Sequence, residues 1–146
     1  MTSLRRLDHV AVLVRSTSDA LRFYEGHLGL QVHSSEEIPN PHVRLTYLDA
    51  GNTFVQLVEP LDTKSTLAAW LDEHGEGLHH ICFGVDDVAG TIAALSDSGE
   101  PVVLGSGRGR ESGFISSGGA NGVRIECTQF DPVLDVEQTK GLLPPA

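Results

Sequence analysis

Cysteine is scarce in this sequence, and basic residues are outnumbered by acidic ones. The two cysteines, Cys82 and Cys127, stand in apolar runs, and neither their number nor their spacing fits a disulfide framework or a thiolate zinc site. We therefore expect two buried free thiols. Ten Lys and Arg residues face twenty Asp and Glu residues, for a formal net charge of −10. This charge disfavours nucleic acid and anionic membranes as partners, because phosphate groups require a basic surface.

Long hydrophobic runs are absent as well. No apolar run approaches the ~20 residues that span a membrane, and the opening residues lead into Asp8 and His9 rather than into an apolar signal core. We therefore expect a cytoplasmic protein without a membrane partner. A hydrophobic content of 40% over 146 residues suffices for the core of one domain, so we expect residues 1–146 to form a single domain.

One strand motif occurs twice. The sequence Leu-Asp-His-Val-Ala-Val, which contains His9, returns as Leu-His-His-Ile-Cys-Phe, which contains His80, 71 residues later. Internal repetition in a short chain indicates two similar modules, which span about residues 5–60 and 76–129. In each module the pattern predicts a strand, a helix and three further strands.

The bounds of these elements follow from apolar spacing and from turn and capping residues. Helices are predicted over 19–28 and 88–98 within the modules, and a linking helix is predicted over 65–74. Strands are predicted over 7–14, 30–37, 43–49, 53–58, 78–85, 101–104, 113–117 and 123–128. The predicted fold class is α+β.

Two polar residues in the last strands of the modules occupy equivalent positions. Gln56 follows His9 by 47 residues and Glu126 follows His80 by 46, and the same offset of one residue already separates the ends of the two module helices. A single strand histidine is more often a hydrogen-bonded core residue than a ligand. A buried Gln or Glu, however, needs a partner or a metal, and four repeat-equivalent polar residues favour a metal site.

We therefore predict that His9, Gln56, His80 and Glu126 bind a divalent metal ion. Imidazoles, an amide oxygen and a carboxylate suit Zn, Co, Ni, Mn or Fe, whereas closed structural zinc sites usually use thiolates. Four protein ligands on a six-coordinate ion leave two positions for water or substrate oxygens, where the ion can polarise a carbonyl and stabilise an enolate. The neighbouring His79 faces the opposite side of its strand and is interpreted as a structural residue or as a support for the ligand residues.

The same residues carry a family resemblance. Segments 7–11, 56–60, 65–71, 75–81 and 122–126 resemble the vicinal oxygen chelate superfamily and, within it, the methylmalonyl-CoA epimerase family. The resemblance implies two βαβββ modules that form a cupped eight-stranded mixed sheet with helices outside. It also implies a homodimer and a divalent-metal-dependent isomerase (a racemase or epimerase) acting on a small acyl-CoA or 2-oxo substrate, with the same four metal ligands.

One position departs from the epimerase pattern in a way that bears on catalysis. Epimerases with a second catalytic carboxylate carry it on the third strand, where this chain has Leu45, and epimerisation is simplest with two acid/base groups. Glu126 would then be the catalytic residue as well as a ligand, as in the related glyoxalase I lyases. His42 is an alternative base, whereas Glu36 and Glu37 are interpreted as solvated turn charges.

The remaining departures concern the pocket mouth and the loops. Phe114 is followed by Ile-Ser-Ser rather than by the family's Leu-His-Pro, which indicates an altered mouth. The glycine-rich segment 105–110 lacks the strand-to-helix context of a phosphate-binding motif. We interpret it as a flexible lid whose Arg108 and Arg110 bind a substrate carboxylate or CoA phosphates, although a plain solvent loop fits the sequence equally well. Residues 131–146 are expected to be extended or frayed.

The leading prediction is a metal-dependent epimerase that interconverts the stereoisomers of methylmalonyl-CoA through an enolate. The first alternative is a glyoxalase-like lyase or isomerase that acts on another 2-oxo or thioester substrate with Glu126 alone. The second is a metal-free protein of the same fold that binds a small molecule such as a drug, although such a protein has no need of the four ligand residues.

Overall fold

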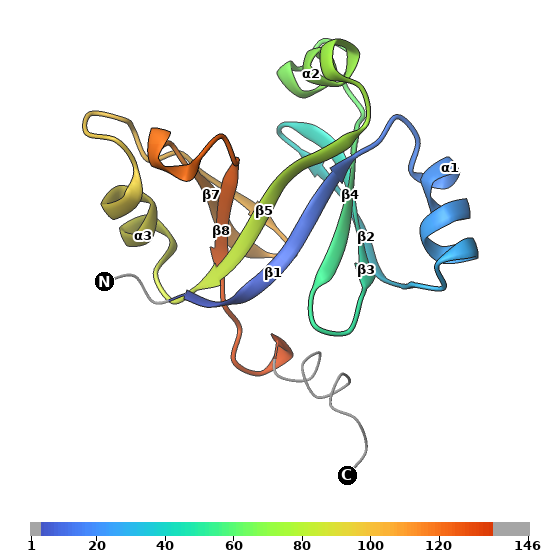
Figure 1. The fold of residues 1–146 in the computed structure, drawn as a ribbon, viewed down its shortest axis with the longest axis horizontal. Coiled ribbons are helices and arrows are strands. Elements are labelled where there is room, and N and C mark those ends of the chain that lie inside the picture. Colours follow the sequence, from blue (N-terminus) through green and yellow to red (C-terminus); the bar gives the residue numbers. More distant parts are fainter. Residues whose placement is uncertain (1–3, 136–146) are drawn as a thin grey trace. The chain divides into compact units, whose positions relative to one another are not determined.

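Eight strands and three α-helices occur along residues 4–135, the part of the chain that this computed structural model describes (Figure 1). The residues cluster into two compact units. Unit 1 contains the described residues up to His9 and those from His80 onward, and unit 2 is Val10–His79. The unit boundaries fall inside the two copies of the repeated motif, so β1 (Leu4–Leu13) and β5 (Gly77–Val85) each contribute to both units.

Unit 2 holds the helix and the three strands that follow β1. Its elements are α1 (Thr17–Leu21), the π-helix η1 (Arg22–His27), β2 (Gln31–Pro39), β3 (His42–Asp49), β4 (Phe54–Pro60) and α2 (Thr66–His74). β3 pairs antiparallel with both β2 and β4. Ser65 caps α2, because its hydroxyl accepts a hydrogen bond from the backbone N–H of Ala68.

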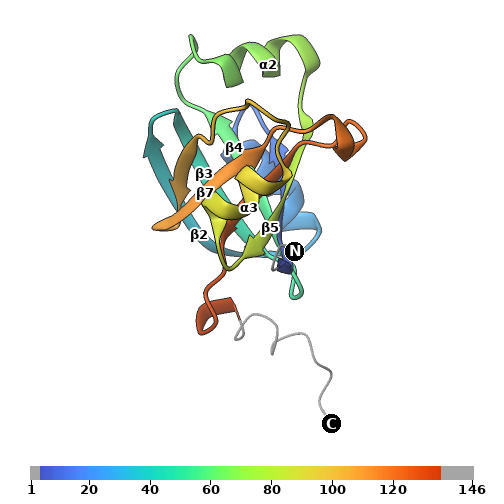
Figure 2. The same ribbon diagram turned by 90° about the vertical axis from the view of Figure 1, so that its left-hand side faces the viewer.

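Unit 1 repeats this plan. β5 is followed by α3 (Val88–Leu95), β6 (Leu104–Gly107), β7 (Arg110–Ile115), the 3₁₀ turn η2 (Gly118–Ala120) and β8 (Ile125–Gln129). β8 pairs parallel with β5 and antiparallel with β7, which in turn pairs antiparallel with β6. α3 packs against β7 and β8 (Figure 2).

The strands follow the order β2-β3-β4-β1-β5-β8-β7-β6 in one eight-stranded sheet. The sheet is mixed, because β5 and β8 are parallel whereas β7 and β8 are antiparallel. The predicted α+β class, the mixed eight-stranded sheet and the strand–helix–strand–strand–strand plan of each module are therefore confirmed. Among the helices within residues 4–135, none has the length and apolar character that a membrane crossing needs.

The apolar clusters follow the alternation of the strands. In unit 2, Ala11 and Leu13 of β1 pack with β3, β4 and α2, whereas Val12 and Val14 pack with α1 and η1. Successive side chains of a strand point to opposite faces, so His9 lies on the face of Ala11 and Leu13. In unit 1 the buried cluster joins α3 to β5 and β8.

Two helices differ from the sequence prediction. The first, predicted over 19–28, is a short α-helix that continues as a π-helix, and apolar spacing over ten residues does not separate these two forms. α3 ends at Leu95 rather than at residue 98. The backbone N–H of Asp97 donates to the carbonyl of Ser116 over 2.7 Å, and the Ser96 hydroxyl accepts from the Ser116 N–H. The segment after Leu95 therefore pairs with the end of β7 instead of extending the helix.

Candidate metal centre

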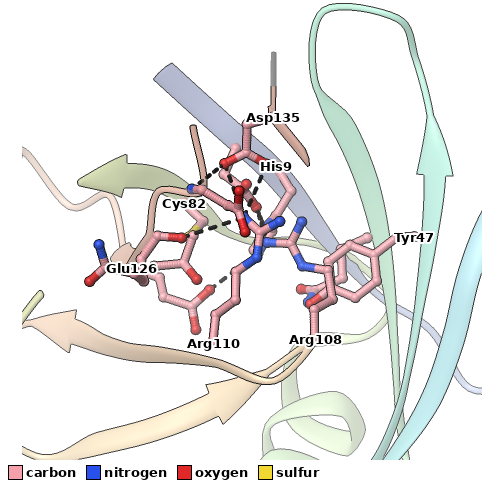
Figure 3. Close-up of polar contacts among 12 residues, drawn as sticks. His9, Tyr47, Cys82, Arg108, Arg110, Glu126 and Asp135 are labelled. Carbon is pink, nitrogen blue, oxygen red and sulfur yellow. Dashed lines mark hydrogen bonds and ion pairs between the residues drawn. The ribbon is translucent and has the colours of Figure 1, made fainter. Parts of the chain in front are cut away.

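Three of the four predicted ligands come together in unit 1. His9 Nε2 and His80 Nε2 each lie 3.2 Å from the same carboxylate oxygen, Oε1 of Glu126. The strand register explains this meeting, because Cys82 of β5 and Glu126 of β8 are paired positions and His80 lies on the same face of β5 as Cys82. Figure 3 shows His9, Cys82 and Glu126 within one group of polar side chains.

The three side chains differ in exposure and in charge. The side chain of Glu126 is 14% exposed, compared with 2% for His9 and 7% for His80, so Glu126 is the member that a substrate can reach most easily. Burial alone would raise the pKa of the Glu126 carboxyl, but the neighbouring imidazoles of His80 and His9 outweigh this effect and hold the pKa well below its usual value. Glu126 is therefore an anion, the form that binds a cation.

The contacts in this cluster fit a bound divalent cation. A metal ion holds nitrogen and oxygen ligands at about 2.0–2.2 Å, so two ligand atoms on one ion lie about 3 Å apart, close to the 3.2 Å separations between Glu126 and each histidine. Ligand atoms of all three side chains also lie within 4.8 Å of one another. Lone pairs of neutral imidazoles would repel the carboxylate oxygen at this distance, and either a proton or a metal cation between them removes the repulsion.

Asp8 contacts both His9 and Arg108. The sequence prediction missed these two contacts. His9 Nδ1 lies 2.7 Å from Oδ2 of Asp8, and the nitrogen donates because a carboxylate only accepts. The same oxygen accepts a hydrogen bond from Nη2 of Arg108. Burial acts against the charge of Asp8, but His9 and Arg108 lower the pKa of its carboxyl below the usual value. The available signal was the acidic residue directly before a ligand histidine, since metal-bound histidines commonly donate their other N–H to a carboxylate.

Gln56 belongs to unit 2, where its surroundings differ from those of Glu126. Its Nε2 donates to Tyr47 Oη over 2.8 Å, and Tyr47 is its paired position across β3 and β4. Gln56 is 3% exposed, and its Oε1 is a buried oxygen without a hydrogen-bond partner among the described residues. An oxygen of this kind suits a metal ligand, but the role of Gln56 as the fourth ligand stays a prediction.

Leu45 lies in a buried, apolar part of unit 2. It is 9% exposed and packs in the same cluster as Val43, Tyr47 and Val58, so no carboxylate projects from this position. The alternative base His42 alternates to the opposite face of β3. Its Nε2 lies 3.4 Å from a carboxylate oxygen of Glu37, and both of these side chains are exposed.

The interpretation of Glu36 and Glu37 as turn charges is wrong, because both residues lie within β2. Glu37 is exposed and pairs with Arg44 over 2.8 Å. Glu36 is the register partner of Leu45, and it is more buried than Glu37.

The glycine-rich segment 105–110 forms a hairpin rather than an irregular loop. β6 and β7 pair up to Gly107 and Arg110, and the two residues between them, Arg108 and Gly109, have φ of +54° and +69°, as in a type I′ turn. Arg108 pairs with Asp8, and the Nη1 of Arg110 donates to both carboxylate oxygens of Asp135 over 3.0 Å. Both guanidinium groups thus bind carboxylates of this chain, and their predicted contact with a substrate anion stays a prediction.

The segment after β8 is only partly as expected. Asp131 accepts hydrogen bonds from the N–H groups of Val133 and Leu134, and Asp135 is buried against Arg110. Residues 131–135 therefore form an ordered turn instead of a frayed end, while residues 136–146 lie outside the described part of the chain.

The cysteines and Phe114 complete the surroundings of the cluster. Cys82 and Cys127 are free and buried, as predicted. Burial raises the pKa of the Cys82 thiol well above its usual value, so the thiol stays protonated and is a poor metal ligand. Phe114, paired in register with Glu126, packs edge-to-face on His80 with ring centroids 5.0 Å apart.

Comparison with known proteins identifies the family of the chain. The sequence model of the glyoxalase/bleomycin resistance protein/dioxygenase superfamily matches residues 8–116. The chain belongs to this superfamily, also called the vicinal oxygen chelate superfamily. The resemblance predicted from the repeated histidine strands is thereby confirmed.

Several relatives within the superfamily are epimerases. The ethylmalonyl-CoA/methylmalonyl-CoA epimerase of Cereibacter sphaeroides is 31% identical over 131 residues, which cover 85% of this chain and 97% of that protein. The mitochondrial methylmalonyl-CoA epimerase of Homo sapiens is 32% identical over 133 residues, which cover 87% of this chain and 75% of that protein.

A solved structure gives a similar result. It contains a Streptomyces coelicolor methylmalonyl-CoA epimerase variant, with a glutamate replaced by leucine, in complex with 2-nitronate-propionyl-CoA. The likeness has a TM-score of 0.78 at 31% identity and covers 90% of this chain and 98% of that one.

Proposed function

We propose that this chain is a metal-dependent epimerase that interconverts the stereoisomers of methylmalonyl-CoA. The observation that carries the proposal is the convergence of His9, His80 and Glu126 in a chain about 30% identical to methylmalonyl-CoA epimerases. The related S. coelicolor variant was solved with an acyl-CoA analogue, which supports an acyl-CoA as the substrate class.

Each residue of the cluster has a proposed role in the reaction. His9, His80 and Glu126 hold the ion, and Gln56 is proposed as the fourth ligand from its repeat-equivalent position. When bound, the ion supplies Lewis-acid polarisation of the thioester carbonyl. Glu126 takes the proton from the carbon between the thioester and the carboxylate of methylmalonyl-CoA, which leaves an enolate. Solvent water delivers a proton to the opposite face of the enolate, and Glu126 releases its own proton to solvent, so the other stereoisomer forms with no net gain or loss of atoms.

The decisive experiment combines metal analysis with hydrogen exchange. The purified full chain should contain close to one equivalent of a divalent metal and should incorporate deuterium from D₂O at the α-carbon of methylmalonyl-CoA. Removal of the metal with a chelator should stop the exchange, and addition of Co²⁺ should restore it. Protein without metal affinity would overturn the metal-dependent mechanism. A metal-loaded protein that exchanges no deuterium would contradict the proposed epimerase activity, but not the membership of the superfamily.

A second candidate is a glyoxalase-like lyase or isomerase on another 2-oxo or thioester substrate. The buried Leu45 favours it, because a reaction that moves a proton with Glu126 alone needs no second carboxylate. The hemithioacetal of methylglyoxal and glutathione is a suitable test substrate. Turnover of this compound, without exchange into methylmalonyl-CoA, would support the second candidate.

Three further assignments stay predictions. A metal-free small-molecule binder is disfavoured by the converging ligand atoms, and a purified protein without metal would favour this alternative again.

The homodimer is tested by light scattering of the purified chain, where a mass near 31 kDa, twice the 15.6 kDa of one chain, is expected. The cytoplasmic location is tested by cell fractionation.

A further inference from the structure

Arg108 lies on the turn of the β6–β7 hairpin. Its guanidinium donates to the carboxylate of Asp8, which lies 100 residues earlier in the sequence. Its side chain is 10% exposed and that of Asp8 is 1% exposed. The backbone of Arg108 has a φ of +54°, a conformation for which Asn or Gly is the usual choice in such a turn. An arginine in this conformation carries a small backbone cost, which its contact with Asp8 offsets.

Asp8 links this arginine to the ligand histidine. Oδ2 of Asp8 accepts from both Arg108 Nη2 and His9 Nδ1. The buried Asp8 carboxylate is thus held between the Arg108 guanidinium and the His9 imidazole, so Arg108 fixes the position of the oxygen that His9 contacts. The contact with Asp8 orients the His9 ring through Nδ1, which leaves Nε2 facing Glu126 as the proposed ligand atom.

We propose that Asp8 and Arg108 are positioning residues for His9, so that the hairpin turn helps to set the metal affinity. The proposal rests on the metal site proposed above. Carboxylates that hold a metal-bound histidine typically contribute about 10- to 100-fold to metal affinity. Arg108 contacts Asp8 and Asp8 contacts His9, so Arg108 should contribute little to metal affinity in the Asp8→Asn variant.

Arg110 provides a matched control on the same hairpin. It is also an arginine paired with a buried aspartate, and the exposed fractions of Arg110 and Asp135 are 12% and 3%. Its Nη1 donates to the carbonyl of Gln129 and to the carboxylate of Asp135, rather than to His9 or Asp8. Replacing either arginine by glutamine leaves a buried carboxylate without its charge partner, so both variants should lose similar thermal stability.

The test measures Co²⁺ affinity of the full chain from the visible absorption of the bound ion. Asp8→Asn and Arg108→Gln should each raise the Kd for Co²⁺ about 10- to 100-fold, whereas Arg110→Gln should stay within about threefold of the wild type. The double variant Asp8→Asn/Arg108→Gln should bind no more weakly than Asp8→Asn alone. Wild-type affinity in Arg108→Gln, or additive losses in the double variant, would overturn the proposal. The double variant removes both charges, so it also serves where a single variant fails to fold.

Proton NMR of the metal-free protein gives an independent readout. The His9 Nδ1–H should resonate at low field in the wild type and in Arg110→Gln, because it donates to an anionic carboxylate. It should move upfield in Arg108→Gln and in Asp8→Asn. An unchanged resonance in Arg108→Gln would show that Arg108 does not influence the hydrogen bond between His9 and Asp8. If the wild type binds no Co²⁺, the proposed function fails, while this resonance still tests the link between Arg108 and His9.

Discussion

Gln56 and Glu126 are equivalent positions of the repeat, yet their side chains are stabilised by different groups. Each lies across the sheet from an aromatic residue, Tyr47 for Gln56 and Phe114 for Glu126. Tyr47 accepts a hydrogen bond from the amide of Gln56. Phe114 offers no such group, and the carboxylate of Glu126 contacts two histidines instead. The repeat thus places a polar side chain at the equivalent position of each module, while different neighbours contact that side chain in the two modules.

The first strands of the two modules, β1 and β5, also differ in the residue that precedes the histidine. The residue before His9 is Asp8, which is fully buried and charged. The residue before His80 is His79, which packs edge-to-face on Trp70 with ring centroids 5.5 Å apart. A histidine that donates to a buried carboxylate is more firmly oriented, so we expect the site to depend more on the neighbour of His9 than on the neighbour of His80.

The largest expected effect distinguishes the two repeat-equivalent residues that are proposed as ligands. Glu126→Gln removes the proposed anionic ligand and the proposed proton-transferring group together, and should lower kcat/KM for α-proton exchange about 10³-fold or more. Gln56→Ala removes only a neutral ligand, so exchange should fall less and should recover in part at high Co²⁺ concentration. The measurement is the rate of deuterium incorporation across a metal titration. Equal losses that no metal concentration restores would contradict the division between a catalytic and a purely ligating residue.

A smaller effect is expected at the aromatic partners. Tyr47→Phe leaves the amide of Gln56 without the bond to Oη and should cost about 1 kcal/mol of unfolding free energy, with a weaker affinity for Co²⁺. Tyr24→Phe, at a partly buried tyrosine of η1, is the matched control and should leave the Co²⁺ affinity unchanged. Urea unfolding and Co²⁺ titration measure the two effects. An unchanged affinity in Tyr47→Phe would show that Gln56 does not need this hydrogen bond to bind metal.

The smallest effect concerns the helices that follow the repeated strands. Ser16 caps α1 and Asp87 caps α3, each by accepting a hydrogen bond from a backbone N–H of the first turn. Ser16→Ala and Asp87→Ala should each cost about 1 kcal/mol of unfolding free energy, without a change in Co²⁺ affinity. Thermal unfolding monitored by circular dichroism measures both. A loss of metal binding in either variant would show that the cluster depends on helix caps as well as on its own neighbours.

Much of the fold could be predicted from the sequence, because the local spacing of apolar residues differs between strands and helices. The register between the modules identified Gln56 and Glu126 as equivalent, and the structure brings Glu126 to the two histidines. The end of α3 was not accessible, because it depends on Ser116, twenty residues after Ser96. The turn at Arg108 was missed for a related reason: glycines around it suggested a mobile loop, whereas the pairing of β6 with β7 makes it a hairpin.

The sequence by itself determined the duplication, the α+β class and which four side chains to examine as ligands, because these depend on residue type and spacing along the chain. Only the tertiary structure decided what surrounds them. It showed that Arg108 and His9 share one oxygen of Asp8, that Arg110 pairs with Asp135, and that Leu45 lies in an apolar cluster. Such contacts join residues far apart in sequence, and burial gives them their strength by removing the water that would otherwise screen the charges.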